Sequence, residues 1–334
     1  MRIALDAMGG DFAPEVTVAG AIEAASEHGI DVILVGDRER LSAFLKERRF
    51  PTNRISIVHA SEVVEMHESP AIALRRKKDS SIRRAIELVK RGDADAVVSA
   101  GHSGVAMATS LFILGKVPHV DRPAIATIMP SLTGFFVLID AGANVDCKPE
   151  NLLQFAQMGS AYFGAVFDVD RPRVALLSIG EEDTKGNELT KEAFKLMKTA
   201  DFNFTGNIEG KDIFTGAADV VVCDGFIGNT VLKVSEGLAE VILRMLKREV
   251  ANMTTGRLGY LMIKPAIRNF KKRTDYSEYG GAPLLGINGA SIISHGRSSA
   301  RAIRNALRYA SEIAAKKVHE IIRDTIEKSA YAKG

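Results

Sequence analysis

The chain of 334 residues has no tryptophan, and phenylalanine and tyrosine bring its aromatic content to only 6%. Proteins that bind single-stranded nucleic acid stack the bases on aromatic side chains, and this chain has few to offer. Its net charge is only +3, from 44 basic and 41 acidic side chains, so no general attraction to a polyanion follows. The composition argues against a nucleic-acid partner.

Cysteine and long apolar runs are also scarce. The two cysteines, Cys147 and Cys223, lie far apart and lack the spacing of zinc ligands, which fits a reducing compartment. The longest apolar stretch, 124–139, is interrupted by Pro130 and Gly134, which favours two buried strands over a membrane span. The first residues read as a strand and not as a secretion signal. We expect a cytoplasmic protein that needs no cofactor and no structural metal.

What the chain does have is a regular alternation of apolar strands and amphipathic helices. Besides the two strands of a repeated motif described below, strands are expected at 2–6, 31–35, 55–59, 125–129, 135–139, 173–179, 203–208 and 290–294. Such alternation predicts one α/β domain over residues 1–334, with a mostly parallel sheet and helices on both faces. The stretch 60–80 is polar and loop-like, and one sustained helical period is expected from Ile303 to Ile322.

A short motif occurs twice, at Ala94–Val105 and at Ala218–Asn229. Each copy reads as a buried strand, a turn bounded by glycines and the start of a helix. A glycine turn lets backbone N–H groups approach a ligand, and the N-terminus of the following helix attracts anions. The motif indicates a paired anion site, and the alternative is two similar strand–helix units with a scaffold role only.

The candidate site residues lie where expected strands end, which is where ligands bind on sheets of this kind. Asp6 and Asp11 can hold a glycine turn rigid, or accept hydrogen bonds from a hydroxyl group or a protonated phosphate. The other candidates for phosphate and substrate binding are Gly9, Gly10, Gly101, His102, Ser103, Gly104, Asn144, Gly225 and Gly228. The candidates for chemistry are Lys185, Asn229 and His295.

These candidates leave several alternatives open. Ser103 is a poor nucleophile candidate, because Val105 occupies the last glycine of the Gly-x-Ser-x-Gly pattern and the side chains of His102 and Ser103 diverge. Lys185 can neutralise phosphate or an oxyanion, or it can belong to a solvated loop with the carboxylates of 181–183, where a divalent metal is conceivable but not required. His295 suits a general acid or base, or a satisfied buried histidine.

The stretch Arg244–Arg273 departs from the pattern, because it carries nine basic side chains and one acidic one. Apolar residues lie between these charges, among them Leu258, Leu261, Met262 and Ile263. We interpret the stretch as a protruding helical excursion with a basic stem and an apolar tip, which can lie on an anionic membrane. The alternatives are a helix pair packed on the body of the protein and a dimer contact.

Taken together, the motifs resemble the bacterial phosphate acyltransferases of phospholipid synthesis over essentially the whole chain. The resemblance rests on eight segments in the same order, namely Asp6–Asp11, Ser99–Gly104, Asp140–Asn144, Lys185–Glu188, Gly206–Glu209, Asp224–Asn229, Tyr279–Pro283 and His295–Gly296. One departure is that the family usually has Asn-Thr-Gly-Ala where this chain has His102, Ser103, Gly104 and Val105.

The resemblance implies a fold like that of phosphotransacetylase and the isocitrate dehydrogenase group, in a homodimer that associates peripherally with the membrane. It implies acyl transfer from acyl-acyl carrier protein to inorganic phosphate, with a glycerol-3-phosphate acyltransferase as downstream partner. Phosphate is then the nucleophile, which the glycine turns and the His295 loop would hold, and Arg75–Lys78 is one basic patch that can dock the acidic carrier protein.

Three alternatives to this function stay open. A short-chain acyl-coenzyme A phosphotransacetylase would use the same fold, and so would a decarboxylating dehydrogenase. No Gly-x-Gly-x-x-Gly follows an expected strand, which disfavours a dinucleotide site of the Rossmann kind. The third alternative is a non-catalytic scaffold on the membrane surface.

Overall fold

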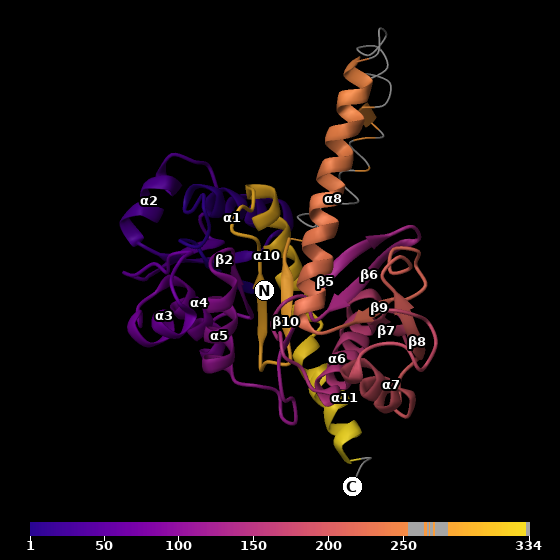
Figure 1. Ribbon diagram of the computed structural model, residues 1–334. Coiled ribbons are helices and arrows are strands. Elements are labelled where there is room, and N and C mark those ends of the chain that lie inside the picture. Colours follow the sequence, from indigo (N-terminus) through magenta and orange to yellow (C-terminus); the bar gives the residue numbers. More distant parts are fainter. Residues whose placement is uncertain (253–263, 266, 268–269, 271–279, 332–334) are drawn as a thin grey trace.

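The structure, a computed structural model, describes residues 1–252, 264–265, 267, 270 and 280–331. One sheet of eleven strands runs through this part of the chain, in the order β3-β2-β1-β4-β11-β10-β5-β6-β9-β7-β8 (Figure 1). The strands are β1 (Arg2–Asp6), β2 (Asp31–Gly36), β3 (Ile55–His59), β4 (Ala96–Ser99), β5 (Ala124–Ser131), β6 (Gly134–Ile139), β7 (Val174–Ser178), β8 (Phe204–Glu209), β9 (Val220–Val222), β10 (Ala282–Leu285) and β11 (Ala290–Ile293).

Two parallel sets of strands make up the sheet. The strands β3, β2, β1, β4 and β11 are parallel to one another, and so are β6, β9, β7 and β8. Between the sets, β10 and β5 pair antiparallel with their neighbours, and β5 and β6 form the hairpin expected from the interrupted apolar run. The predicted mostly parallel sheet is confirmed, with an antiparallel junction at its centre that the sequence did not indicate.

The strands are buried on both faces. Ile3 and Leu5 of β1 lie in one core, whereas Ala4 lies in another, because successive side chains of a strand point to opposite faces. The same division holds in the second set, where Val220 and Val222 share the core of Ile3 and Val221 lies on the opposite face. Burial on both sides explains why these strands read as continuous apolar runs.

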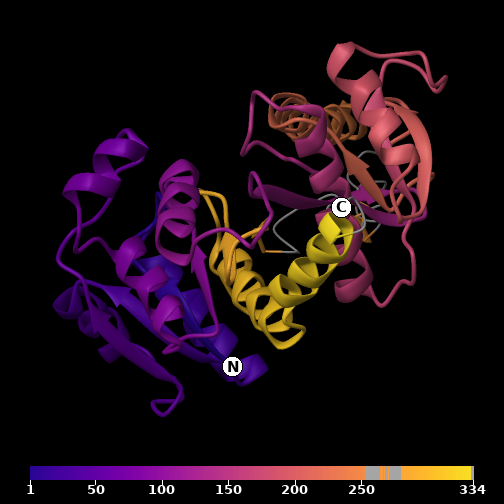
Figure 2. The ribbon, with the colours of Figure 1, turned by 90° about the horizontal axis from the view of Figure 1, so that it is seen from below.

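Helices cover both faces of the sheet. The largest core lies under α1 (Glu15–His28), α6 (Pro149–Phe167), α7 (Glu188–Lys198), α10 (Ala300–Ala315) and α11 (Val318–Tyr331). The opposite face carries α3 (Pro70–Arg76), α4 (Ser81–Arg91) and α5 (Ser103–Leu114) over the first set, and the base of α8 (Gly225–Asn252) over the second. A further helix, α2 (Arg38–Lys46), follows β2. Seen from below, α10 and α11 lie between the two halves, α10 against α1 and α11 against α6 (Figure 2).

Two expectations about helices are wrong. The polar stretch 60–80 contains the helix α3, whose first residue, Pro70, suits a helix start. The long C-terminal helix is two helices, α10 and α11, because Lys317 between them adopts a positive φ of 49°. The apolar period passes through this break unchanged, so the sequence pattern gave no sign of it.

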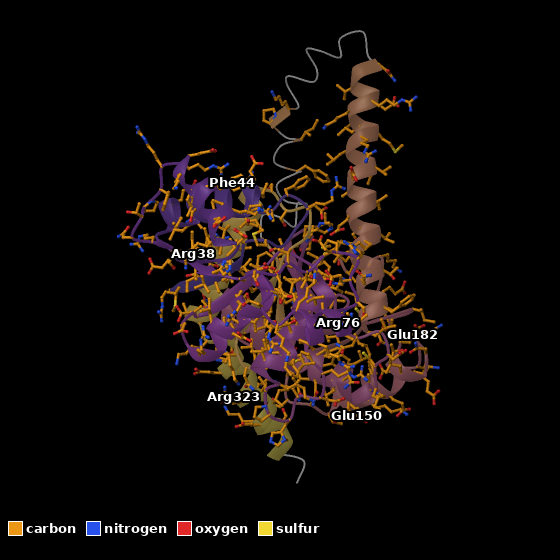
Figure 3. All side chains as sticks on the ribbon, turned by 90° about the vertical axis from the view of Figure 1, so that its left-hand side faces the viewer. Arg38, Phe44, Arg76, Glu150, Glu182 and Arg323 are labelled. Atoms are coloured by element: carbon orange, nitrogen blue, oxygen red, sulfur yellow. The ribbon has the colours of Figure 1, made fainter. Side chains whose placement is uncertain are left out.

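The helix α8 leaves the body of the protein and projects from it, as Figures 1 and 3 show. Its 28 residues begin at Gly225 and span about 42 Å at 1.5 Å per residue. Residues 244–252 of the basic stretch continue this helix. The four apolar residues expected at the tip, Leu258, Leu261, Met262 and Ile263, lie outside the described residues. No helix within the described ranges is long and apolar enough to cross a membrane.

Candidate active site

A cleft of about 510 Å³ lies between the two halves of the sheet. The turns that follow β1, β4 and β11 form one side, and the loop after β6 and the first turns of α8 form the other. Five of the predicted site residues line it, namely Asp11, Gly101, Ser103, Asn229 and His295. Both copies of the repeated motif thus contribute to one cleft, but they do so in different ways.

Close backbone contacts join the three turns of the first side. Gly10 has a φ of 110°, and a Cβ atom there would lie 3.1 Å from the carbonyl oxygen of Gly296 and 3.2 Å from that of Ala100. The backbone N–H of Asp11 donates to the Gly296 carbonyl at 2.8 Å. The glycine at position 10 is therefore needed both for its left-handed backbone and for the close approach of the β4 and β11 turns.

The first copy of the motif presents unused N–H groups to the cleft. His102 is the N-cap of α5, and its Nδ1 accepts a hydrogen bond from the backbone N–H of Val105 at 3.4 Å. The backbone N–H groups of Ser103 and Gly104 have no hydrogen-bond partner among the described residues. The N–H of Gly101 is already used, because it donates to Ser99 Oγ. The N-terminus of α5 thus has two backbone amides without an internal partner, beside the Ser103 hydroxyl, and Ser103 lines the cleft.

The second copy uses most of the corresponding N–H groups within the protein itself. The carboxylate of Asp224 accepts from the N–H of Ile227 at 2.9 Å, and the N–H of Gly225 donates to the Asn144 carbonyl at 2.7 Å. A Cβ at Gly228 would lie 1.8 Å from the carbonyl oxygen of Asp140. Gly225 and Gly228 thus allow α8 to pack against the loop after β6, and neither lines the cleft.

A hub of hydrogen bonds around Asp140 supports this second side. Asp140 is fully buried, and its Oδ1 accepts from the N–H groups of Ile125, Gly142 and Ala143 at 3.0, 3.2 and 3.0 Å. Its Oδ2 accepts from the backbone N–H and the side-chain amide of Asn144, at 2.7 and 2.9 Å. Burial raises the pKa of the Asp140 carboxyl, and the N–H donors act in the opposite direction. Asn144 therefore shapes the loop and does not line the cleft.

Asn229 extends from α8 over this loop. A Cβ at Gly142 would lie 3.4 Å from Asn229 Cβ and 3.7 Å from its Oδ1, so the two residues are in close contact. The Asn229 side chain is exposed, lines the cleft and makes no hydrogen bond to another described residue. Its amide is available to orient a substrate from the side of the cleft opposite α5.

Lys185 lies elsewhere. It is exposed in the loop after β7, and its backbone N–H donates to the Glu182 carbonyl at 3.0 Å. No residue of this loop lines the cleft. The nearby carboxylate of Asp183 pairs with Lys198 at 2.9 Å. In the ranges that the structure covers, no group of three or more His, Cys, Asp or Glu side chains could hold a metal ion.

Two basic side chains line the cleft that were not among the predicted site residues, namely Lys233 and Arg297. Lys233 forms an ion pair with Glu236, also in the cleft, at 2.9 Å. Arg297 forms no ion pair with another residue of the described part of the chain. Both could have been found, since Lys233 is one helical turn beyond Asn229 and Arg297 is two residues beyond His295.

His295 lines the cleft and is held by a hydrogen bond to its own loop. Its Nδ1 accepts from the backbone N–H of Arg297 at 3.1 Å, so the neutral ring carries its proton on Nε2. Burial raises the pKa of the Cys147 thiol to about 11, which leaves little thiolate near neutral pH. Cys147 therefore stays a thiol and is no activated nucleophile.

The fold is that of a known group of acyl-transferring enzymes. The structure superimposes on a phosphotransacetylase from Streptococcus pyogenes with a TM-score of 0.64 and 21% identity, over 96% of this chain and 94% of the other. A phosphotransacetylase from Staphylococcus aureus gives a TM-score of 0.61 and 17% identity, over 94% of both chains. The expected likeness to phosphotransacetylase is confirmed at the level of the fold.

The sequence comparisons are more specific. Residues 1–321 match the family described as "Fatty acid synthesis protein". The phosphate acyltransferase of Thermodesulfovibrio yellowstonii is 60% identical, over 98% of this chain and 95% of the relative. That of Geobacter sulfurreducens is 54% identical, over 98% of this chain and 94% of the relative. The chain belongs to the phosphate acyltransferase family and is an acyltransferase, as the resemblance of its motifs indicated.

Proposed function

We propose that this enzyme transfers a fatty acyl group from acyl-acyl carrier protein to inorganic phosphate, within the cleft between α5 and α8, and so makes acyl phosphate for phospholipid synthesis. The observation that carries the proposal is the N-terminus of α5, where the amides of Ser103 and Gly104 have no internal partner and Ser103 lines a cleft large enough for an acyl thioester. Membership in the phosphate acyltransferase family supports it.

The chemistry needs no enzyme nucleophile. A phosphate oxygen bound at α5 attacks the thioester carbonyl carbon, the new C–O bond forms and the C–S bond breaks. The proton that the attacking hydrogen phosphate gives up goes to the leaving thiolate, so that a thiol and an acyl phosphate are formed, and His295 lines the cleft where this transfer takes place. Asn229 donates to the developing oxyanion from the opposite side of the cleft. Holding both reactants in line supplies much of the lowering of the barrier.

The charge of the bound phosphate needs compensation. Arg297 is the best candidate, because it lines the cleft without an ion-pair partner in the described residues, whereas Lys233 already pairs with Glu236. Lys185 is the residue that the sequence analysis proposed for neutralising phosphate, but it would have to do so from a loop that does not line the cleft. Replacement of each by alanine separates them, since the residue that holds phosphate raises the KM for phosphate on removal.

The carrier protein would dock beside the cleft on α3. Arg75, Arg76 and Lys78 are exposed there (Arg76 is labelled in Figure 3), whereas Lys77 is held by Glu68. The start of this helix adjoins the anion site, since a Cβ at Gly104 would lie 3.2 Å from Pro70 Cγ. An acidic carrier protein bound to α3 would thus deliver its acyl arm to the N-terminus of α5.

The assembly and location that we propose are a homodimer at the inner surface of the membrane, close to the glycerol-3-phosphate acyltransferase that would consume the product. The projecting helix α8 supports both, because it carries exposed apolar residues and leads into the basic stretch up to Arg273. The membrane contact itself is assigned to residues outside the described ranges, and flotation with anionic vesicles, with and without Leu258→Glu, tests it.

The decisive experiment incubates the purified enzyme with palmitoyl-acyl carrier protein and phosphate, and measures loss of thioester and gain of acyl phosphate. We expect both to depend on phosphate, and Arg297→Ala to raise the KM for phosphate. Acetyl-coenzyme A in place of the carrier protein tests the short-chain alternative. No phosphate-dependent turnover with either donor would overturn the proposal.

A further inference from the structure

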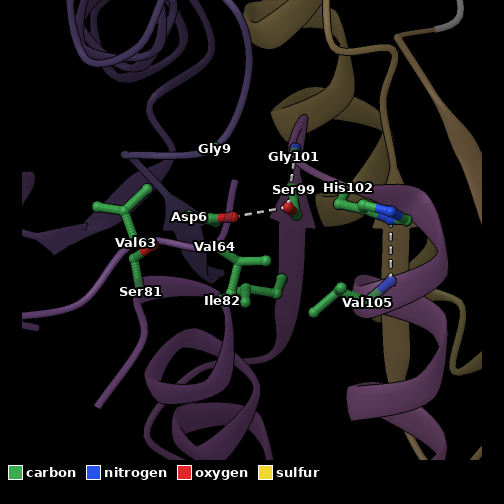
Figure 4. Close-up of a pocket in the computed structure, with 10 residues that line it drawn as sticks. All are labelled: Asp6, Gly9, Val63, Val64, Ser81, Ile82, Ser99, Gly101, His102 and Val105. Atoms are coloured by element: carbon green, nitrogen blue, oxygen red, sulfur yellow. Dashed lines mark hydrogen bonds between the residues drawn. The ribbon is translucent and has the colours of Figure 1, made fainter. Parts of the chain in front are cut away.

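A small, partly open cavity of about 10 Å³ lies behind the Gly101–Gly104 turn and shares Gly101 with the cleft. Asp6 of β1 and Ser99 of β4 line it from neighbouring strands, and His102 lines it from the turn itself (Figure 4). A cavity of about 10–15 Å³ has room for one water molecule if polar groups line it. The residues around this cavity are thus placed to act on the anion-binding turn from within the protein.

A chain of two hydrogen bonds connects the cavity to the turn. The Ser99 hydroxyl donates to Asp6 Oδ2 at 2.7 Å, and Ser99 Oγ in turn accepts from the backbone N–H of Gly101 at 3.1 Å. The turn after β1 adds to this contact, since a Cβ at Gly9 would lie 2.4 Å from Asp6 Oδ2 and 2.9 Å from the Gly101 nitrogen. Asp6 therefore touches the anion-binding turn through Ser99 and does not reach the cleft itself.

The second oxygen of the Asp6 carboxyl group, Oδ1, has no hydrogen-bond partner among the described residues. Asp6 is only 2% exposed, and its Oδ1 accepts no hydrogen bond of ordinary geometry from the described residues. Burial raises the pKa of the Asp6 carboxyl, which the hydroxyl groups of Ser81 and Ser99 partly oppose. A buried acceptor without a partner is uncommon in folded proteins, and an enclosed water is the usual way to satisfy one.

We propose that Asp6 and Ser99 are positioning residues that hold the Gly101–Gly104 turn in its anion-binding shape, with one water molecule in the cavity as hydrogen-bond donor to Asp6 Oδ1. The proposal rests on the function proposed above, because phosphate is the anion that the turn binds. Of the two roles that the sequence leaves open for Asp6, it takes up the first, in which Asp6 holds a glycine turn rigid, and not direct contact with phosphate. Asp6 and Ser99 do not contact phosphate. They affect its binding by fixing the orientation of the backbone amides of Ser103 and Gly104.

Ser99→Ala tests the relay, and Ser110→Ala is its matched control. Ser110 is buried in the same helix as the turn, and its hydroxyl bonds to that of Ser291 at 3.0 Å, away from the cleft. We expect Ser99→Ala to raise the KM for phosphate about tenfold, which corresponds to about 1.4 kcal/mol, with the KM for the acyl donor unchanged. Ser110→Ala should lower the melting temperature to a similar degree and leave both KM values as in wild type.

If Ser99→Ala does not fold, two variants of Asp6 provide a second test of the positioning role. Asp6→Asn keeps an oxygen that accepts from Ser99, so we expect it to retain a KM for phosphate near that of wild type, whereas Asp6→Ala should raise it as Ser99→Ala does. A KM for phosphate in Ser99→Ala equal to that in Ser110→Ala, or no difference between Asp6→Asn and Asp6→Ala, would overturn the positioning role. A crystal structure with an empty cavity would overturn the water site.

A failure of the proposed function can be told apart from a failure of this relay. If wild-type enzyme shows no phosphate-dependent turnover, the relay is read from binding instead, as the rise in melting temperature that inorganic phosphate causes. Ser99→Ala should lose this rise and Ser110→Ala should keep it. A wild-type rise that Ser99→Ala retains in full would reject the relay, whatever the enzyme catalyses.

Discussion

His102 is one position where this chain departs from the usual pattern of its family, and in the structure it is the N-cap of α5. Its Nδ1 caps α5 by accepting from the Val105 amide at 3.4 Å, and the backbone of the turn presents the groups that face the cleft. Asparagine is among the preferred N-cap residues and offers an acceptor at the same place. The imidazole therefore substitutes for an amide as a cap, and no separate chemical role is needed.

We expect His102→Asn to keep the activity of wild type and at least its stability, because the cap is retained. His102→Ala should lower the free energy of unfolding by about 0.5–2 kcal/mol, the usual loss for an N-cap. Urea denaturation gives the stabilities, and the thioester assay gives the activities. A His102→Asn enzyme that folds as well as wild type but has lost turnover would show that the imidazole takes part in the reaction.

At the scale of the element, the start of α8 shows how one residue type serves two purposes. Gly101 and Gly228 occupy glycine positions of the same motif, yet the first lies in a turn that lines the cleft and the second allows contact with the Asp140 carbonyl. The sequence could predict strands, turns and helix starts, because each depends on local periodicity and on glycine. It could not predict which copy has unused amides, because that depends on the loop at Asn144, far away in the chain.

Two of the three glycines of α8, Gly228 and Gly237, give a matched pair of variants. Gly228→Ala would place a Cβ 1.8 Å from the Asp140 carbonyl oxygen, so we expect a loss of several kcal/mol, or no folded protein, from overpacking against backbone. Gly237→Ala meets nothing within 4 Å, and in an exposed helix it should stabilise by up to about 1 kcal/mol. Thermal unfolding of both variants measures the difference, and equal stabilities would contradict the close packing of α8 on the β6 loop.

A second element, the polar stretch 60–80, is held to α4 by Asp79. Its carboxylate accepts from both the backbone N–H and the hydroxyl of Ser61, at 2.8 and 2.7 Å, and from Arg84 Nε at 2.7 Å. These partners lower the pKa of Asp79 to about 2, with the Ser61 hydroxyl as the largest cause. The sequence showed only a polar loop here, since pairing across 18 residues leaves no periodic signal.

The lowered pKa predicts how this tether depends on pH. Because the folded-state pKa lies below the ordinary 3.8, the stabilisation is complete above that value and disappears as the pH falls towards 2. Asp79→Asn should cost about 1 kcal/mol at neutral pH, a figure reduced for solvent screening, and nothing near pH 2. Urea titrations across this range measure it, with Asp93→Asn as a control that disrupts the more exposed pair with Arg91. A cost that does not change with pH would reject the assignment.

At the scale of the whole molecule, the projecting part of α8 carries a row of exposed apolar side chains. It projects from the body (Figure 3), and its apolar residues follow a spacing of four and three along Ile227, Val231, Val234, Leu238, Val241 and Met245. This is the a/d spacing of a coiled-coil seam. Five of the six are exposed large apolar side chains, and the sixth, Val231, packs at the base of the helix.

We propose that α8 of a second copy of the chain packs against this seam. Two identical helices with the same heptad spacing can pair through the same residues on each. The same pairing would place the two basic stretches next to each other and concentrate their positive charge, which favours contact with an anionic membrane. Dimerisation and membrane association would then depend on the same helix, with the cleft at its base.

Leu238→Glu tests this arrangement, because it introduces a charge at the middle of the seam. We expect the wild-type enzyme to sediment as a dimer and the variant as a folded monomer, in analytical ultracentrifugation at micromolar concentration. Leu132→Glu is the control, since Leu132 is 85% exposed at the tip of the β5–β6 hairpin, away from α8. A variant that remains dimeric would place the dimer contact elsewhere and leave the α8 seam for the residues between 253 and 279 or for the membrane surface. Monomeric Leu238→Glu with normal turnover would show further that each subunit carries a complete cleft.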